Sequence, residues 1–240
     1  MKGAWKTPRS GSPTYLIEGL GPVLEYARAA PSLIRAINCR DAETRQELQR
    51  LAAFITPPPI FTLTSSAPGL LSKSKAACCA EVFGHTLTLQ DFTPFGPEVT
   101  RAVVLDHVTD PRNVGAIART AAFFGFHAIF APSRRQGLLT EASVATAQGA
   151  FAHLPLVVVP NISQLLVMLK KEEFWIIGAD VGASPIAQQS SDFNRVAIVL
   201  GSENEGLSRV TKAKCDVLAG IPGSPAGLQS LNVSVAAGIF

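Results

Sequence analysis

The sequence predicts an α/β protein built around a parallel sheet, and two observations lead to that prediction. From Glu98 onward, short apolar runs alternate with stretches of helical periodicity. The runs are continuously apolar instead of alternating with polar residues, which is typical of parallel strands buried on both faces. The expected strands are Ala102–Leu105, Ala128–Ala131, Pro155–Val159, Trp175–Gly178 and Val196–Leu200.

Residues 13–90 predict a second, smaller α/β domain ahead of that sheet. Helices are expected at Leu20–Ala29 and at Asp41–Phe54, where Asp41 can serve as the N-cap and a triple proline follows the helix. Strands are expected at Ile34–Cys39, Ile60–Leu63 and His85–Leu89, and a helix begins within Leu70–Ala77. We expect residues 1–12 to form a flexible polar tail, 91–97 (DFTPFGP) a linker and 98–240 the larger domain.

Composition narrows the class of protein. The chain of 240 residues is 47% apolar and 16% charged, as in ordinary globular proteins, and it has no unbroken apolar run of the roughly 20 residues that a membrane span needs. The four cysteines form no CxxC and no zinc-type spacing, which predicts no metal site and a cytoplasmic location. Residues 1–97 hold 10 basic and 7 acidic residues, and residues 98–240 hold 11 of each, so the net charge of +3 mildly favours an anionic partner.

The polar loop after Leu105 is the first candidate for chemistry, because ligands of open α/β sheets bind at the carboxyl ends of the strands. We expect a helix to begin near Asn113, which is a good N-cap residue, so that the first turn could bind an anion. Arg119 lies within this helix among apolar residues. Such an arginine needs an anionic or hydrogen-bonding partner, either a ligand or a structural salt bridge.

Two later loops are further candidates. Residues 201–207 (GSENEGL) follow a buried strand, and Gly201 and Gly206 permit tight turns there. The acidic residues between them disfavour phosphate and suit a cationic ligand, a metal or a partner arginine. Residues 221–237 form a Gly/Pro/Ser loop that leads into a helix, where Ser230 and Asn232 could act as caps, their more frequent role, or contact a ligand.

Taken in order, these three segments resemble the three signature motifs of the SpoU/TrmH family of RNA ribose methyltransferases. The segments are LDHVTDPRNVGAIARTAAFFG (105–125), IVLGSENEGLS (198–208) and IPGSPAGLQSLNVSVA (221–236). Residues 141–156 also resemble the helix and strand that link the family's first two motifs. Three long motifs in the right order are a specific signal.

The resemblance implies both a fold and a reaction. The fold is a parallel sheet with helices on both faces and a deep C-terminal trefoil knot, as in the SPOUT superfamily, assembled as a homodimer with each site near the subunit interface. The reaction is methylation of a ribose 2′-hydroxyl in RNA, with S-adenosyl-L-methionine as the cofactor. Residues 13–90 are similar, more loosely, to the small substrate-binding domain of family members that act on ribosomal RNA. Ribosomal RNA is therefore the favoured substrate, and transfer RNA is the alternative.

The resemblance also assigns residues by position. Catalytic roles fall on Arg119, Asn113, Glu203, Ser230 and Asn232. The cofactor is expected to be held mainly by backbone groups around Leu200, Gly201, Ile221, Leu231 and Ala179. RNA phosphates are expected at Arg112, Arg134 and Arg135. Arg119 either activates the hydroxyl or, because arginine stays protonated, clamps the adjacent phosphate and stabilises the emerging alkoxide. Glu203 would hold Arg119 or the sulfonium of the cofactor.

The sequence departs from the family pattern at two places, and two other functions remain as alternatives. The third motif has one more residue between Ile221 and Leu231 than we expect, together with two prolines, which predicts a differently shaped cofactor loop. The sequence ends at Phe240, where the family continues a helix that helps to close the knot and the dimer.

A non-catalytic RNA-binding relative is disfavoured by the intact motif residues. A dinucleotide-dependent α/β enzyme is disfavoured because no GxGxxG follows the first strand of the larger domain.

Overall fold

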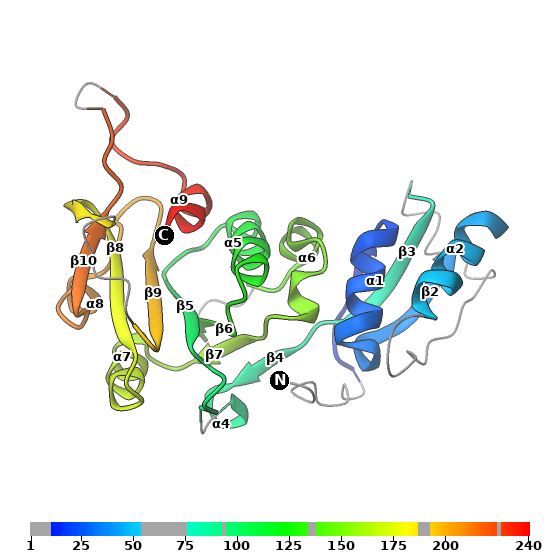
Figure 1. The fold of residues 1–240 in the computed structure, drawn as a ribbon, viewed down its shortest axis with the longest axis horizontal. Helices are drawn as coiled ribbons and strands as arrows, with labels where there is room; N and C mark the ends of the chain where they lie inside the picture. Colours follow the sequence, from blue (N-terminus) through cyan, green and yellow to red (C-terminus); the bar gives the residue numbers. More distant parts are fainter. Residues whose placement is uncertain (1–10, 54–75, 93–94, 134–137, 187–192, 225–226) are drawn as a thin grey trace.

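A computed structural model describes residues 11–53, 76–92, 95–133, 138–186, 193–224 and 227–240, which form two β-sheets (Figure 1). The larger sheet has seven strands in the order β10-β8-β9-β5-β6-β7-β4, and every neighbouring pair is parallel. Its strands are β4 (Thr86–Thr88), β5 (Arg101–Asp106), β6 (Ala128–Pro132), β7 (Leu156–Val159), β8 (Trp175–Pro185), β9 (Val196–Gly201) and β10 (Val217–Gly220). The predicted parallel α/β sheet and its five expected strands are confirmed.

Helices cover both faces of this sheet. One face carries α5 (Pro111–Phe123), α6 (Glu141–Ala147) and α9 (Val233–Ile239), and the other carries α4 (Leu89–Phe92) and α7 (Ile162–Lys171) (Figure 1). A short helix, α8 (Arg209–Lys212), and a 3₁₀ turn, η2 (Ala150–Ala152), complete the unit. Along β5, Val103 and Leu105 enter the core beneath α5, whereas Ala102 and Val104 enter the core above α7. Because successive side chains of a strand point into two different cores, the buried residues on both faces of the strand are apolar.

The smaller sheet is antiparallel, with the strand order β1-β3-β2. Its elements are β1 (Thr14–Glu18), α1 (Leu20–Ala29), the 3₁₀ turn η1 (Pro31–Leu33), β2 (Ile34–Cys39), α2 (Ala42–Ala52) and β3 (Cys78–Phe83). The Asp41 side chain caps α2 as predicted, accepting a hydrogen bond from Thr44 N at 2.6 Å. The expected strand Ile60–Leu63 lies outside the described residues, as do residues 1–10 of the expected tail. Of the expected helix start, only Ala76 and Ala77 are described.

The boundary expected at residue 90 does not follow the sheets. The strand that we predicted at His85–Leu89 as part of the smaller domain is β4, and it pairs with β7 at the edge of the larger sheet. The expected linker is also part of the larger unit, because Phe92 and Phe95 are buried there and their rings pack edge-on against Phe130. The change from one sheet to the other therefore falls between β3 and β4.

The two units pack directly against each other. Tyr15 Oη in β1 donates a hydrogen bond of 2.7 Å to the carbonyl of Leu139, just before α6. His153 Nε2 lies 2.6 Å from Glu25 Oε2 of α1. Gly149 sits so close to α1 that an added Cβ would lie 2.9 Å from Glu25 Cβ. The joint is therefore formed by β1 and α1 on one side and by α6 and η2 on the other.

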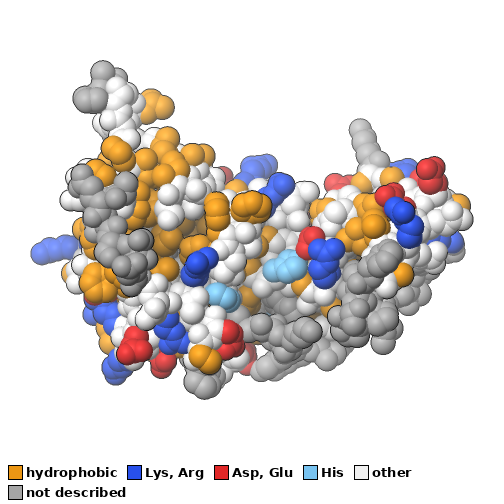
Figure 2. All heavy atoms as spheres, in the orientation of Figure 1, with side chains coloured by type: hydrophobic (Ala, Val, Ile, Leu, Met, Phe, Trp, Pro, Cys, Tyr) orange, Lys and Arg blue, Asp and Glu red, His pale blue; other side chains and the backbone are white. Residues whose placement is uncertain are grey.

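Helix α9 packs beside α5, and the two helices together expose an apolar surface. The exposed fractions are 84% for Phe123, 51% for Phe124, 52% for Val235 and 48% for Ile239. We call these four residues the α5–α9 face. Figure 2 shows hydrophobic side chains gathered around α9 on the side of the molecule in view. An exposed apolar patch of this kind on a folded domain commonly marks an interaction surface.

Candidate active site

Helix α5 begins two residues earlier than expected. Asp110 is its N-cap, with a side chain that accepts a hydrogen bond from Arg112 N at 2.8 Å, and Pro111 takes the first helical position, where no N–H is needed. Asn113 therefore lies within the first turn and is not the cap that we predicted. Its side chain is buried, and its amide remains free to contact other loops.

The Asn113 amide connects all three motif segments. Its Nδ2 donates to Glu203 Oε1 at 2.7 Å, and its Oδ1 accepts from Asn232 Nδ2 at 3.2 Å. Asn232 also caps α9, accepting from Ser234 N at 2.9 Å, so the predicted capping role is confirmed. With donor and acceptor both engaged, the Asn113 amide is held in one orientation. One residue from each loop thus forms the Glu203–Asn113–Asn232 chain.

Arg119 is exposed on α5, as is Arg112. A spacing of seven residues places both on the same side of the helix, roughly 10 Å apart along its axis. Within the described residues, neither guanidinium has a hydrogen-bond or ion-pair partner. The structural salt bridge considered for Arg119 is therefore not found there, and Glu203 contacts Asn113 instead of Arg119. Both cations remain available to an anionic ligand.

The loop after β9 is a tight hairpin. Ser202 and Gly206 exchange backbone hydrogen bonds of 3.0 and 2.9 Å, and Glu205 N donates to Ser202 Oγ at 3.1 Å. A Cβ on Gly201 would lie 2.1 Å from the carbonyl carbon of Gly206, so glycine is required there. Leu200 is fully buried and can offer a ligand only its backbone.

The carboxyl ends of β8, β9 and β10 lie side by side, because β8 pairs with both other strands. The β8–β10 ladder is interrupted after Gly178, and the chain bulges outward before pairing resumes at Ser184. Gly220 lies close to this bulge, where an added Cβ would be 2.7 Å from the Ala183 carbonyl oxygen. The predicted cofactor residues Ala179, Gly201 and Ile221 therefore come from neighbouring strand ends.

The remaining predicted residues are less closely tied to this cluster. Leu231 precedes the cap of α9 and is half exposed. Ser230 is exposed and has no hydrogen bond within the part of the chain that the structure describes. Arg134 and Arg135 lie outside the described residues.

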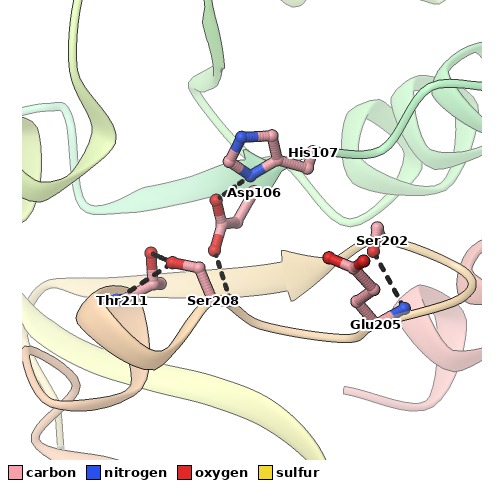
Figure 3. A network of polar contacts seen from close by, with 6 residues as sticks. All are labelled: Asp106, His107, Ser202, Glu205, Ser208 and Thr211. Atoms are coloured by element: carbon pink, nitrogen blue, oxygen red, sulfur yellow. Dashed lines mark hydrogen bonds and ion pairs between the residues drawn. The ribbon is translucent and has the colours of Figure 1, made fainter.

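Sequence reasoning missed Asp106, the last residue of β5. Its side chain is 1% exposed, although it is a carboxylate. One oxygen accepts from Ser208 N at 2.9 Å, and the other lies 2.7 Å from Nδ1 of His107 (Figure 3). Ser208 in turn caps α8 through a 3.2 Å hydrogen bond from Thr211 N. A lone aspartate at the end of an apolar strand was the only signal of this contact in the sequence.

The cysteines play no part in the site. Cys39, Cys78 and Cys79 are buried in the smaller unit, and burial raises the pKa of each thiol above its ordinary value. Burial also raises the pKa of Cys215 to about 11. Within the described ranges, no group of His, Cys, Asp and Glu side chains could hold a metal ion, and no helix is both long and apolar enough to cross a bilayer.

A parallel α/β sheet with polar loops joined at the carboxyl ends of its strands is typical of proteins that bind their ligands at that edge. Residues 100–240 match the SpoU rRNA methylase family. The chain is 44% identical over 230 residues to the 23S rRNA (guanosine-2′-O-)-methyltransferase RlmB of Coxiella burnetii, covering 93% of this chain and 92% of that protein. It is 41% identical over 137 residues to RlmB of Escherichia coli K12, an alignment that covers only 56% of the relative, so about half of that protein's length is matched.

Solved structures show the same fold. The SpoU methyltransferase AviRb from Streptomyces viridochromogenes, in complex with the cofactor AdoMet, superposes with a TM-score of 0.75 over 94% of this chain and 87% of AviRb, at 22% identity. A structure described as an RNA 2′-O ribose methyltransferase gives a TM-score of 0.72 over 98% of this chain and 89% of its own, also at 22% identity. The chain belongs to the SpoU rRNA methylase family.

Proposed function

We propose that this protein transfers a methyl group from S-adenosylmethionine to a ribose 2′-hydroxyl of ribosomal RNA. The observation that carries the proposal is the Glu203–Asn113–Asn232 chain, in which Asn113 of the first family motif is hydrogen-bonded to one residue from each of the other two motifs at the carboxyl edge of the sheet. The relatives in Coxiella burnetii and Escherichia coli are named as 23S rRNA guanosine-2′-O-methyltransferases, which favours ribosomal over transfer RNA.

The groups at this edge suit the cofactor. S-adenosylmethionine carries no phosphate, and when bound it supplies an electrophilic methyl group on a sulfonium cation. The strand ends at Ala179, Gly201 and Ile221 offer backbone donors and acceptors, and exposed Leu231 offers an apolar surface for the adenine ring. Glu203 places a carboxylate on the same side, which favours a cation over a phosphate. We assign the cofactor to these residues.

Arg119 would act on the RNA, because its guanidinium is exposed and unpaired within the described residues. It would bind the phosphate next to the target ribose and stabilise negative charge as the 2′-oxygen loses its proton. An arginine that stays protonated serves poorly as the proton acceptor, so we favour the clamp over the base. Arg112, on the same side of α5, would contact a second phosphate.

The smaller unit would bind part of the RNA, and the protein would work in the cytoplasm, where its free cysteines persist.

We also propose that the C-terminal region forms the trefoil knot of the SPOUT superfamily. The strand order β8-β9-β5, in which the sixth strand of the larger sheet along the chain lies between the fifth and the second, is compatible with that topology.

We further propose a homodimer that buries the α5–α9 face, and Phe123→Glu is expected to convert it to a monomer. A charge in place of an 84%-exposed phenylalanine would have to be desolvated in the dimer but would remain hydrated in the monomer. Light scattering coupled to size-exclusion chromatography measures the mass directly. Val210→Glu, which alters a 59%-exposed valine on α8, is the matched control and should keep the mass of the dimer. A monomeric unmodified protein would contradict the proposal.

Labelled methyl transfer to total RNA, followed by digestion to nucleosides, tests the proposed function. We expect label from S-adenosylmethionine in a 2′-O-methyl nucleoside when the ribosomal RNA is taken from cells that lack this protein. RNA from cells that contain the protein should accept little label, because the site is already methylated. Label found on a base, or only in transfer RNA, would overturn the proposed reaction or the proposed substrate respectively.

A further inference from the structure

Asp106 is a buried carboxylate with no assigned role, at the centre of the carboxyl edge. It ends β5 and lies directly opposite Gly201, the last residue of β9, in the parallel ladder. Its side chain is almost completely shielded from solvent. Burying a carboxylate is unfavourable unless hydrogen-bond donors compensate, and here two donors, Ser208 N and His107 Nδ1, face its two oxygens.

The backbone of His107 is held in an unfavourable conformation where it meets this carboxylate. Its φ is +68°, in the left-handed region that non-glycine residues rarely adopt. Such strain persists only where the surrounding structure enforces it, and it concentrates at functional sites. The imidazole is half exposed, so solvation alone does not require it to contact Asp106. The contact is therefore part of a built arrangement.

Asp106 fixes one end of the loop that follows β9. At its start, the loop is held by the close approach of Gly201 to Gly206. At its other end, Ser208 is tied by its backbone N–H to Asp106, while its hydroxyl accepts from Thr211 N to cap α8 (Figure 3). Glu203 lies between these two anchors and reaches Asn113. Loss of the Asp106 contact would free the loop from β5.

We propose that Asp106 is a positioning residue for the methyl-transfer reaction: it holds residues 201–208 in the shape that binds S-adenosylmethionine and that keeps Glu203 against Asn113. The inference rests on the proposed function, since it assumes that this loop binds the cofactor. Asp106 would touch neither the cofactor nor the RNA. Its effect would reach the site through Ser208 and the loop backbone.

Asp106→Ala tests the proposal, with calorimetric binding of S-adenosylmethionine and thermal unfolding as paired readouts. We expect the dissociation constant to rise roughly tenfold, the scale of one lost hydrogen bond to a charged group. Asp216→Ala is the matched control, because the Asp216 carboxylate also accepts a backbone N–H, from Ile176 at 2.8 Å, and also accepts from a side-chain nitrogen, Lys170 Nζ at 2.6 Å. Asp216 lies at the amino ends of β8 and β10, far from the carboxyl edge. The Asp216→Ala variant should therefore have a lower melting temperature but an unchanged affinity for the cofactor.

Asp106→Asn provides a rescue. Its amide oxygen can accept from Ser208 N, and its NH₂ can donate to the His107 ring in the other tautomer. Both hydrogen bonds are therefore kept without the negative charge. We expect cofactor affinity within about twofold of the unmodified protein, because both hydrogen bonds are retained. If Asp106→Asn lowers cofactor affinity as much as Asp106→Ala does, the proposal that Asp106 positions the loop through its hydrogen bonds is overturned.

His107→Gly keeps the proposal falsifiable if Asp106→Ala does not fold. Glycine accepts a positive φ without strain, which offsets part of the cost of the lost hydrogen bond to Asp106, so the variant should fold while cofactor affinity falls through the lost donor. Glu173→Gly, at φ +63° in the turn between α7 and β8, relieves the same strain elsewhere and should leave affinity unchanged. Unchanged affinity in both the His107 and Asp106 variants would overturn the inference while leaving the proposed function intact. Failure of the unmodified protein to bind the cofactor would overturn both.

Discussion

Arg119→Ala is expected to reduce methyl transfer to RNA at least about a hundredfold, the effect of removing one group that stabilises charge in a transition state. Affinity for S-adenosylmethionine should be unchanged. The guanidinium is exposed and unpaired within the described residues, so its removal breaks no contact there that supports the fold or the cofactor loops. Single-turnover transfer at saturating RNA, with calorimetric cofactor binding, separates these two quantities.

A matched control comes from the opposite edge of the same sheet. Arg101 begins β5, and its guanidinium donates to the Phe124 carbonyl at 3.1 Å. Arg101→Ala removes the same charge from the protein but should leave the transfer rate within about twofold, because electrostatic effects at exposed sites are screened over roughly 10 Å at 0.1 M salt. Equal loss of rate in the two variants would mean that only net charge matters. Loss of cofactor binding in Arg119→Ala would contradict its assignment to the RNA.

Gly201→Ala is expected to abolish cofactor binding and to lower the free energy of unfolding by about 1–3 kcal/mol, as overpacking of a tight site does. The added methyl group would lie 2.1 Å from Gly206 C and 2.3 Å from Leu207 N. Both obstacles are backbone atoms. The loop has little freedom to move away, since Ser208 is fixed to Asp106.

Chemical denaturation and calorimetry measure the two parts of this prediction. Gly21→Ala is the control, because nothing lies within 4 Å of a Cβ at that position of α1. Alanine within a helix should raise the free energy of unfolding by about 0.5–1 kcal/mol and leave cofactor binding unchanged. Full cofactor affinity in Gly201→Ala would show that this loop is not part of the cofactor site.

The elements of the larger sheet could be predicted because their sequences carry a strong signal. The five expected segments are apolar without interruption, and β5, β6, β7 and β9 have buried side chains in two cores at once. Strand β10 is only four residues long and contains Ala and Gly, so it lacked that signal. In the smaller unit, α1, α2 and β2 were predictable from spacing and from the Asp41 cap. Strands β1 and β3 were missed.

The candidate site was predictable as a set of loops but not as a set of contacts. Asp110 and Asn113 are both good N-caps, and Pro111 decides between them because it favours the first helical position. The hydrogen bonds from Asn113 to Glu203 and to Asn232 join residues far apart in the chain, and no local pattern encodes such pairs. The carboxylate of Asp106 was overlooked for the same reason.

The pairing of β4 with β7 has a consequence for the order in which the chain assembles during synthesis. All three strands of the smaller sheet have been made by Phe83, so that sheet can close while the rest of the protein is still being translated. Thr86, only three residues further on, must wait for Leu156, which emerges after β5, α5, β6 and α6. The smaller unit can thus be in place before η2 is synthesised, and α1 would then present a finished surface on which Gly149 and His153 dock.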